Sequence, residues 1–172
     1  MGKGCISPES WDFQGGESVP IDKLFSWVID QKDIEGLTIS GGEPVDQAEP
    51  LTELCIHLRE KIDIGIMCYT GYKHENLMEE GTPAQKKLLE SIDILIDGEY
   101  LEDRHSNLLW RASSNQRIIC LSNRYEKQIS TLTFDTDRSA GIECSVSPAG
   151  TILIAGVPSE ARFREEFLKA LY

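Results

Sequence analysis

The chain has 172 residues, of which 40% are hydrophobic and 27% charged, ordinary proportions for a globular protein with its own core. Its formal net charge of −12 argues against general nucleic-acid binding and against docking on anionic membranes, because both require a basic surface. No apolar run approaches the roughly 20 residues of a membrane helix and no signal-peptide core follows Met1, so we expect a cytoplasmic protein whose partners are neither nucleic acid nor membrane.

The first half of the chain alternates helical and strand-like segments. Apolar residues recur at helical spacing in three stretches, and short apolar runs that end near glycine lie between them. Thr82 and Gln85 have the spacing of a capping box, which predicts the start of the third helix. In chain order, the predicted elements are a loop over 1–16, a helix over 21–32, a strand over 37–40, a helix with Pro50 in its first turn, a strand over 63–69, a helix over 83–90 and a strand over 92–96.

The pattern changes after residue 98. The predicted elements are an irregular segment over 99–115, a strand over 117–121, a hairpin formed by 142–146 and 151–155, and a last amphipathic helix carrying Phe163, Phe167 and Leu171. No repeat, linker or low-complexity tract divides the chain. We therefore expect one domain over residues 1–172.

The alternation of helices and strands predicts parallel strands joined by crossover helices. In such sheets, ligands bind at the carboxyl ends of the strands. A glycine-containing segment follows each of the three predicted strands, at 41–44, 69–72 and 97–100. We expect these segments to form one ligand-binding edge, although glycine also simply terminates strands.

A local basic patch could still offset the acidic net charge. The candidate row is Arg104, Arg111, Arg117 and Arg124. Arginines in such a row are more often solvated loop charges than a binding patch, and we expect the former here.

Five cysteines are scattered along the chain: Cys5, Cys55, Cys68, Cys120 and Cys144. An odd, irregularly spaced set does not look like a disulfide framework. The last four lie in apolar segments, where we expect small buried side chains. Cys5 stands apart, since glycines and polar residues surround it.

The most informative stretch is Ser40-Gly41-Gly42-Glu43-Pro44. Two glycines let backbone polar groups approach a ligand closely, and the proline fixes the exit of the turn. The glutamate places a carboxylate at the strand end, where it can orient the turn or meet a cation. Taken alone, the stretch is equally compatible with a tight strand-to-helix turn.

Other motifs accompany this turn in a fixed order. They are Cys5 followed by Ile6-Ser7-Pro8-Glu9-Ser10-Trp11, Tyr69-Thr70-Gly71-Tyr72, Asp93-Ile94-Leu95-Ile96-Asp97-Gly98, Ser113-Ser114-Asn115-Gln116-Arg117, and the ending from Gly150-Thr151-Ile152 to Gly156-Val157-Pro158. Together they resemble the radical S-adenosylmethionine (radical SAM) activating enzymes, and the resemblance extends over nearly the whole chain.

The resemblance implies an α/β fold: a partial, open (β/α) barrel of the radical SAM type with a C-terminal β-hairpin and helix. It implies a [4Fe–4S] cluster with Cys5 as a ligand, since thiolates suit iron–sulfur iron. The implied SAM-binding residues are Gly41, Gly42, Glu43, Pro44, Tyr69 and Thr70. The implied function is that of an oxidoreductase activase, in which SAM cleavage yields a 5′-deoxyadenosyl radical that generates a glycyl radical on a partner such as anaerobic ribonucleotide reductase.

The chain departs from the family in its cluster motif, Cys-x-x-x-Cys-x-x-Cys. Cys5 corresponds to the last cysteine, but Gly2 stands where the second should be, and the position of the first precedes Met1. The first strand of the family's sheet is missing as well. We therefore expect an N-terminally truncated form whose 172 residues do not hold a stoichiometric cluster. The alternative is a cluster-free relative that serves as a protein-binding module.

Overall fold

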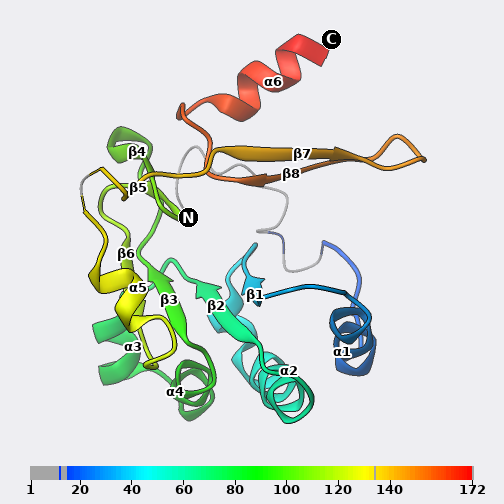
Figure 1. Cartoon of the computed structure of the whole chain (residues 1–172), viewed down its shortest axis with the longest axis vertical. Coiled ribbons are helices and arrows are strands. Elements are labelled where there is room, and N and C mark those ends of the chain that lie inside the picture. The colour runs from blue at the N-terminus through cyan, green and yellow to red at the C-terminus, as the bar shows by residue number, and fades with distance from the viewer. Residues whose placement is uncertain (1–11, 13–14, 134, 172) are drawn as a thin grey trace. The chain divides into compact units, whose positions relative to one another are not determined.

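The computed structural model describes residues 12, 15–133 and 135–171 (Figure 1). The chain divides into two compact units. The first, here called the sheet unit, comprises the described residues of 7–98 and 118–130. The second, here called the hairpin unit, comprises the described residues of 99–117 and 131–172.

The sheet unit is built from alternating helices and strands, as the sequence predicts. Its elements in chain order are α1 (Ile21–Ile29), β1 (Gly36–Ile39), the 3₁₀ helix η2 (Pro44–Gln47), α2 (Ala48–Lys61), β2 (Gly65–Tyr69), α3 (His74–Glu80), α4 (Pro83–Glu90), β3 (Ile94–Asp97), β6 (Arg117–Cys120, of which all but Arg117 belong to this unit) and α5 (Glu126–Ser130). The predicted capping box is confirmed, because Thr82 Oγ1 accepts from the Gln85 amide and Gln85 Oε1 accepts from the Thr82 amide.

The four strands form one sheet in the order β1-β2-β3-β6. β1 pairs with β2 in parallel, with Gly36 opposite Gly65, and β2 pairs with β3 in parallel, with Met67 opposite Ile94. The predicted parallel arrangement of these three strands is therefore confirmed. Parallel strands carry their carboxyl ends to the same edge, which gives the site its position.

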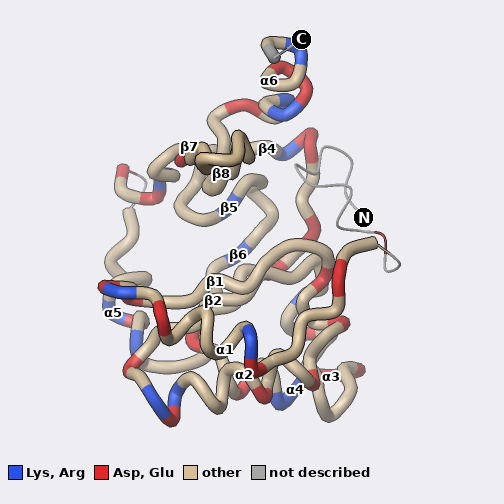
Figure 2. The backbone as a smooth tube through the Cα atoms, turned by 90° about the vertical axis from the view of Figure 1, so that its right-hand side faces the viewer, with Lys and Arg blue, Asp and Glu red and all other residues tan. Residues whose placement is uncertain are grey.

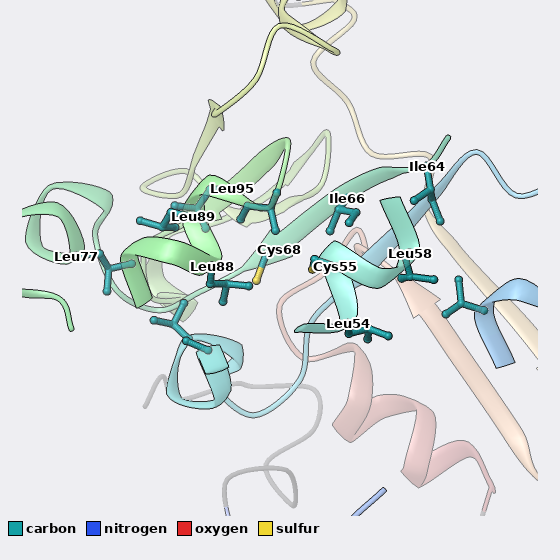
Figure 3. Close-up of a cluster of buried hydrophobic side chains, with 14 residues drawn as sticks. Leu54, Cys55, Leu58, Ile64, Ile66, Cys68, Leu77, Leu88, Leu89 and Leu95 are labelled. Atoms are coloured by element: carbon teal, nitrogen blue, oxygen red, sulfur yellow. The ribbon is translucent and has the colours of Figure 1, made fainter. Parts of the chain in front are cut away.

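The core of the sheet unit lies between the strands and the helices that connect them (Figure 3). α2 contributes Leu54, Cys55 and Leu58, and α4 contributes Leu88 and Leu89. These side chains pack against buried residues of β2 and β3. Both strands are near-continuous apolar runs, as is usual for parallel strands that are covered by other elements. Burying a leucine of this kind stabilises the fold by about 1.5–3 kcal/mol.

Three short elements of the sheet unit were not predicted: η2, α3 and α5. α3 begins at His74, whose backbone amide donates to Asp97 Oδ2 over 2.8 Å. The cap of this helix comes from a residue 23 positions away, so a local sequence pattern could not indicate where it starts.

The hairpin unit contains two antiparallel strand pairs and a helix. Its elements are the 3₁₀ helix η3 (Glu102–Arg104), β4 (His105–Leu108), β5 (Arg111–Ser113), β7 (Ile142–Val146), β8 (Ile152–Gly156) and α6 (Phe163–Leu171). The predicted hairpin of β7 and β8 and the last helix are confirmed. The expectation that 99–115 is irregular is wrong, since β4 pairs with β5 there through an irregular register.

Two further predictions can be judged from side chains. Arg111 pairs with Asp137 and Arg124 pairs with Asp63, and their side chains are only 14% and 29% exposed, so the expectation of solvated loop charges is wrong for these two arginines. Cys55 and Cys68 are buried and Cys120 is half-buried, but Cys144 is exposed, so the expected burial is wrong for Cys144. Its strand is exposed along its whole length.

Among helices in the described part of the chain, none combines the length and the hydrophobicity required to cross a bilayer.

Candidate functional site at the carboxyl edge of the sheet

The loops that follow β1, β2 and β3 meet at one edge of the sheet. The Thr70 amide donates to the Ile96 carbonyl over 2.9 Å, and the Gly98 amide donates to the Tyr72 carbonyl over 3.1 Å. These bonds join the loop after β2 to the end of β3. The predicted shared edge is thus confirmed for these two loops, and Glu43 links the loop after β1 to them.

The turn after β1 depends on its two glycines. Gly41 has φ +84° and Gly42 has φ +52°, a region that side-chain-bearing residues rarely adopt. A Cβ placed on Gly41 would meet no atom within 4 Å, so open space adjoins this backbone. A ligand can therefore approach the turn at Gly41.

Glu43 fastens this turn to the neighbouring loop. Its Oε1 accepts from the Thr70 hydroxyl over 2.8 Å and from the Val45 amide over 3.1 Å. Its Oε2 accepts from the Gly71 amide over 2.8 Å. Of the two roles that the sequence suggested for this carboxylate, orienting the turn is the one that these contacts demonstrate.

The residues after Glu43 anchor the turn from the other side. Pro44 begins η2 and is buried together with Val45. The Val45 carbonyl accepts from Gln85 Nε2 of α4 over 3.5 Å. Asp46 accepts from the Tyr72 hydroxyl over 3.0 Å, a second bond between the loops after β1 and β2. The turn is thus held at several points rather than by Glu43 alone.

Tyr69 and Thr70 close β2 beside this turn. Thr70 is 5% exposed, and its hydroxyl joins the hydrogen bonds of Glu43. Burial raises the pKa of the Tyr69 phenol to about 12, so it is protonated at neutral pH. The structure therefore brings Thr70 into the site with Gly41–Pro44, and Tyr69 precedes it at the strand end.

The described residues do not provide a ligand set for an iron–sulfur cluster. Cys5, the predicted ligand, lies outside them. Cys55 and Cys68 are core side chains, and burial raises the pKa of both thiols, to about 12 in Cys68, which opposes the thiolate form that metals require. Within the described part of the chain, no group of three or more His, Cys, Asp or Glu side chains could hold a metal ion.

A second feature lies at the opposite edge of the sheet unit and was not predicted. A hollow of about 530 Å³ is lined there by residues that include Arg59, Asp63, Asp93 and Arg124. Two of its cations are paired, Arg59 Nη2 with Asp93 Oδ2 over 2.9 Å and Arg124 with Asp63. Asp93 also accepts from the Ile66 amide over 2.8 Å. These bonds join α2, β2 and the start of β3. The charged residues that line the hollow therefore hold elements of the sheet unit together.

Comparison with known proteins gives one family and a set of relatives. A model of the family described as a 4Fe-4S single cluster domain matches residues 2–119. The anaerobic ribonucleoside-triphosphate reductase-activating protein of Haemophilus influenzae is 36% identical over 126 residues, which cover 67% of this chain and 77% of the relative.

Two other relatives carry the same description. The activating protein of Enterobacteria phage T4 is 28% identical, covering 67% of this chain and 74% of its own length. That of Escherichia coli K12 is 29% identical, with 66% and 76% covered. The comparison with solved structures found no match.

Proposed function

The chain belongs to the 4Fe-4S single cluster domain family, and from this premise we propose that it is a radical SAM activase. Its partner would be a glycyl radical enzyme such as anaerobic ribonucleotide reductase, because its relatives are activating proteins of that reductase. A bound cluster, with Cys5 as one ligand, would supply an electron from an external reductant for the reductive cleavage of SAM to methionine and a carbon radical, which would take a hydrogen atom from a glycine of the partner.

The observation that carries the proposal is the turn at Gly41–Pro44. It lies at the carboxyl edge of a parallel sheet, its first glycine borders open space, and its carboxylate is held in place by three donors. Backbone polar groups beside an anchored carboxylate suit the methionyl ammonium of SAM. We propose that Gly41, Gly42 and Glu43 receive that ammonium while Pro44 fixes the turn, with Tyr69 and Thr70 on the same rim.

Three further expectations belong to this proposal. The four-stranded sheet would be part of the partial, open (β/α) barrel of the radical SAM type. Cys5 would be a cluster ligand. The location would be the cytoplasm, where a reductase partner and reduced thiols are found together.

The experiment that tests the proposal measures SAM binding by equilibrium dialysis. Its parent protein carries an added N-terminal segment with the first strand and the first two cysteines of the family motif and is reconstituted anaerobically, because Cys5 by itself cannot hold a cluster. Gly41→Val or Gly42→Val should weaken binding roughly ten- to a hundred-fold, the effect of losing a hydrogen bond to a charged group worth about 1.5–3 kcal/mol. The matched control is Gly150→Val, because Gly150 also has a positive φ, +82°, with no atom within 4 Å of an added Cβ, but belongs to the β7–β8 turn.

Glu43→Gln should weaken SAM binding less than either valine, because it keeps most of the shape of the turn. If Gly41→Val binds SAM as tightly as the parent, the turn is only a structural connection and the site assignment is wrong. If the parent itself fails to bind SAM, the alternative of a protein-binding module is favoured. Spectroscopic detection of a glycyl radical on added anaerobic ribonucleotide reductase then tests the activase role itself.

A further inference from the structure

The hydroxyl of Thr70 has a single proton, and its surroundings decide where that proton points. Thr70 Oγ1 accepts from the Tyr72 amide over 3.1 Å and lies 2.8 Å from Glu43 Oε1. A carboxylate can only accept, so the hydroxyl donates to Glu43 while accepting from Tyr72. Because Thr70 is 5% exposed, water does not compete readily for this bond.

The carboxylate of Glu43 is nearly saturated by such donors. A carboxylate offers about four acceptor positions, two on each oxygen. Thr70 and Val45 occupy both positions on Oε1, and the Gly71 amide occupies one on Oε2. Among the described residues these are its hydrogen-bond donors, which leaves one acceptor position on Oε2.

We propose that Thr70 is a positioning residue that reserves this last acceptor position for the ammonium of the ligand. The inference rests on the proposed function and extends it to the recognition of the ligand's amino group. The Thr70 hydroxyl and the two backbone amides fix the carboxylate in one rotamer. A single remaining position suits a primary ammonium, a compact point donor, and not a guanidinium, which donates in pairs.

The proposal makes a prediction that a purely structural Thr70 does not make. Loss of the hydroxyl should weaken ligands that carry the amino group and spare ligands that lack it. S-adenosylhomocysteine carries the amino-acid end, whereas 5′-methylthioadenosine has the same nucleoside without it. General damage to the loop would weaken both to a similar degree.

The variants are Thr70→Val, which removes the hydroxyl at nearly constant shape, and Thr70→Ser, which keeps it. Thr52→Val is the matched control, because Thr52 is also 5% exposed and its hydroxyl donates instead to the Ala48 carbonyl within α2. Thr70→Val should weaken S-adenosylhomocysteine roughly ten-fold and leave 5′-methylthioadenosine within about two-fold, within the error of a typical affinity comparison. Thr70→Ser and Thr52→Val should match the parent for both ligands.

Equal losses of both ligands in Thr70→Val, or failure of Thr70→Ser to restore binding, would overturn the proposal. A second measurement separates it from the proposed function. Amide hydrogen exchange at Gly71 and Val45 should quicken in Thr70→Val and not in Thr70→Ser or Thr52→Val. Both amides donate to Glu43, and only Thr70→Val removes the hydroxyl that holds this carboxylate in place. If the parent binds neither ligand, the proposed function fails, and unchanged exchange in Thr70→Val would then sink the positioning role as well.

Discussion

The same three residues, Ile-Leu-Ile, occur in a strand of each unit with opposite results. In β3 they are Ile94, Leu95 and Ile96, at most 2% exposed. In β8 they begin with Ile152 and Leu153, which are 41% and 66% exposed. β-propensity places both segments in strands, but β3 has a strand on each side in the four-stranded sheet, whereas β8 pairs only with β7.

An apolar segment of this kind therefore predicts a strand, but it does not predict whether that strand is buried. The hairpin of β7 and β8 carries one charged residue, Glu143, and its backbone is almost without acidic or basic positions in Figure 2. Register places Ile142, Cys144, Val146 and Ile152 on one face of this two-stranded ribbon. A ribbon of two strands has little interior of its own, so its side chains contribute little to stability.

The largest expected difference between the regions is in thiol reactivity. Burial, and more weakly the charge of Glu43, raises the pKa of Cys68 to about 12 from 9.0, so its thiolate should be roughly a thousand-fold scarcer than that of an ordinary cysteine at neutral pH. Cys144 is exposed. Timed alkylation with peptide mapping by mass spectrometry should show Cys144 labelled at least a hundred-fold faster than Cys68. Comparable labelling rates in the native protein would contradict the difference in burial between Cys68 and Cys144.

The next effect is on stability. Leu95→Ala removes a side chain that is 0% exposed at the centre of the sheet, and we expect it to lower the free energy of unfolding by about 2–5 kcal/mol. The matched change Leu153→Ala should cost less than about 0.5 kcal/mol, as surface substitutions do. Urea unfolding monitored by circular dichroism measures both. A cost for Leu153→Ala equal to that for Leu95→Ala would mean that β8 is covered in solution.

The smallest effect concerns acid stability. Burial by itself would raise the pKa of Asp93, but hydrogen bonds from Ser122, the Ile66 amide and Arg59 outweigh it and hold the pKa below 3.8. A lowered pKa stabilises the fold fully above the unfolded value, and this contribution is lost as pH falls through the lower folded value. Asp93→Asn should therefore destabilise the protein at neutral pH by about 1–3 kcal/mol. Its unfolding free energy should also depend less on pH below about pH 4 than that of the parent.

Glu143→Gln is the control for this prediction, because Glu143 lies on the exposed hairpin. It should leave both the stability and its pH dependence unchanged, as measured by urea unfolding at several pH values. If Asp93→Asn keeps the parent's acid profile, the network at the start of β3 does not depend on the charge of Asp93.

Much of the local structure of the sheet unit could be predicted from the sequence. The three parallel strands and the capping box at Thr82 follow from periodicity and short-range side-chain chemistry, and both are confirmed. The pair of glycines likewise predicted a turn after β1, and in the structure both adopt a positive φ. Predicted boundaries differ from the observed ones by a few residues: the second strand begins at Gly65 rather than at Asp63.

Two kinds of feature escaped sequence reasoning. The short helix α3 is capped by Asp97, and β4 pairs with β5 through an irregular register, so neither has a regular local pattern. The exposure of Cys144 could not be foreseen either, because an apolar run reads the same whether or not another element covers it.

The residues that follow each strand could be identified from the sequence, since the order of the strands along the chain and the positions of the glycines are both written in it. The role of Glu43 at this edge could not be identified in the same way, because it depends on contacts between distant segments. Its partners Thr70 and Gly71 lie 27 and 28 residues away, and the bonds exist because β1 and β2 are neighbours in parallel register. Periodicity reports the conformation of a segment, whereas hydrogen bonds between loops depend on which strands become neighbours when the core is buried.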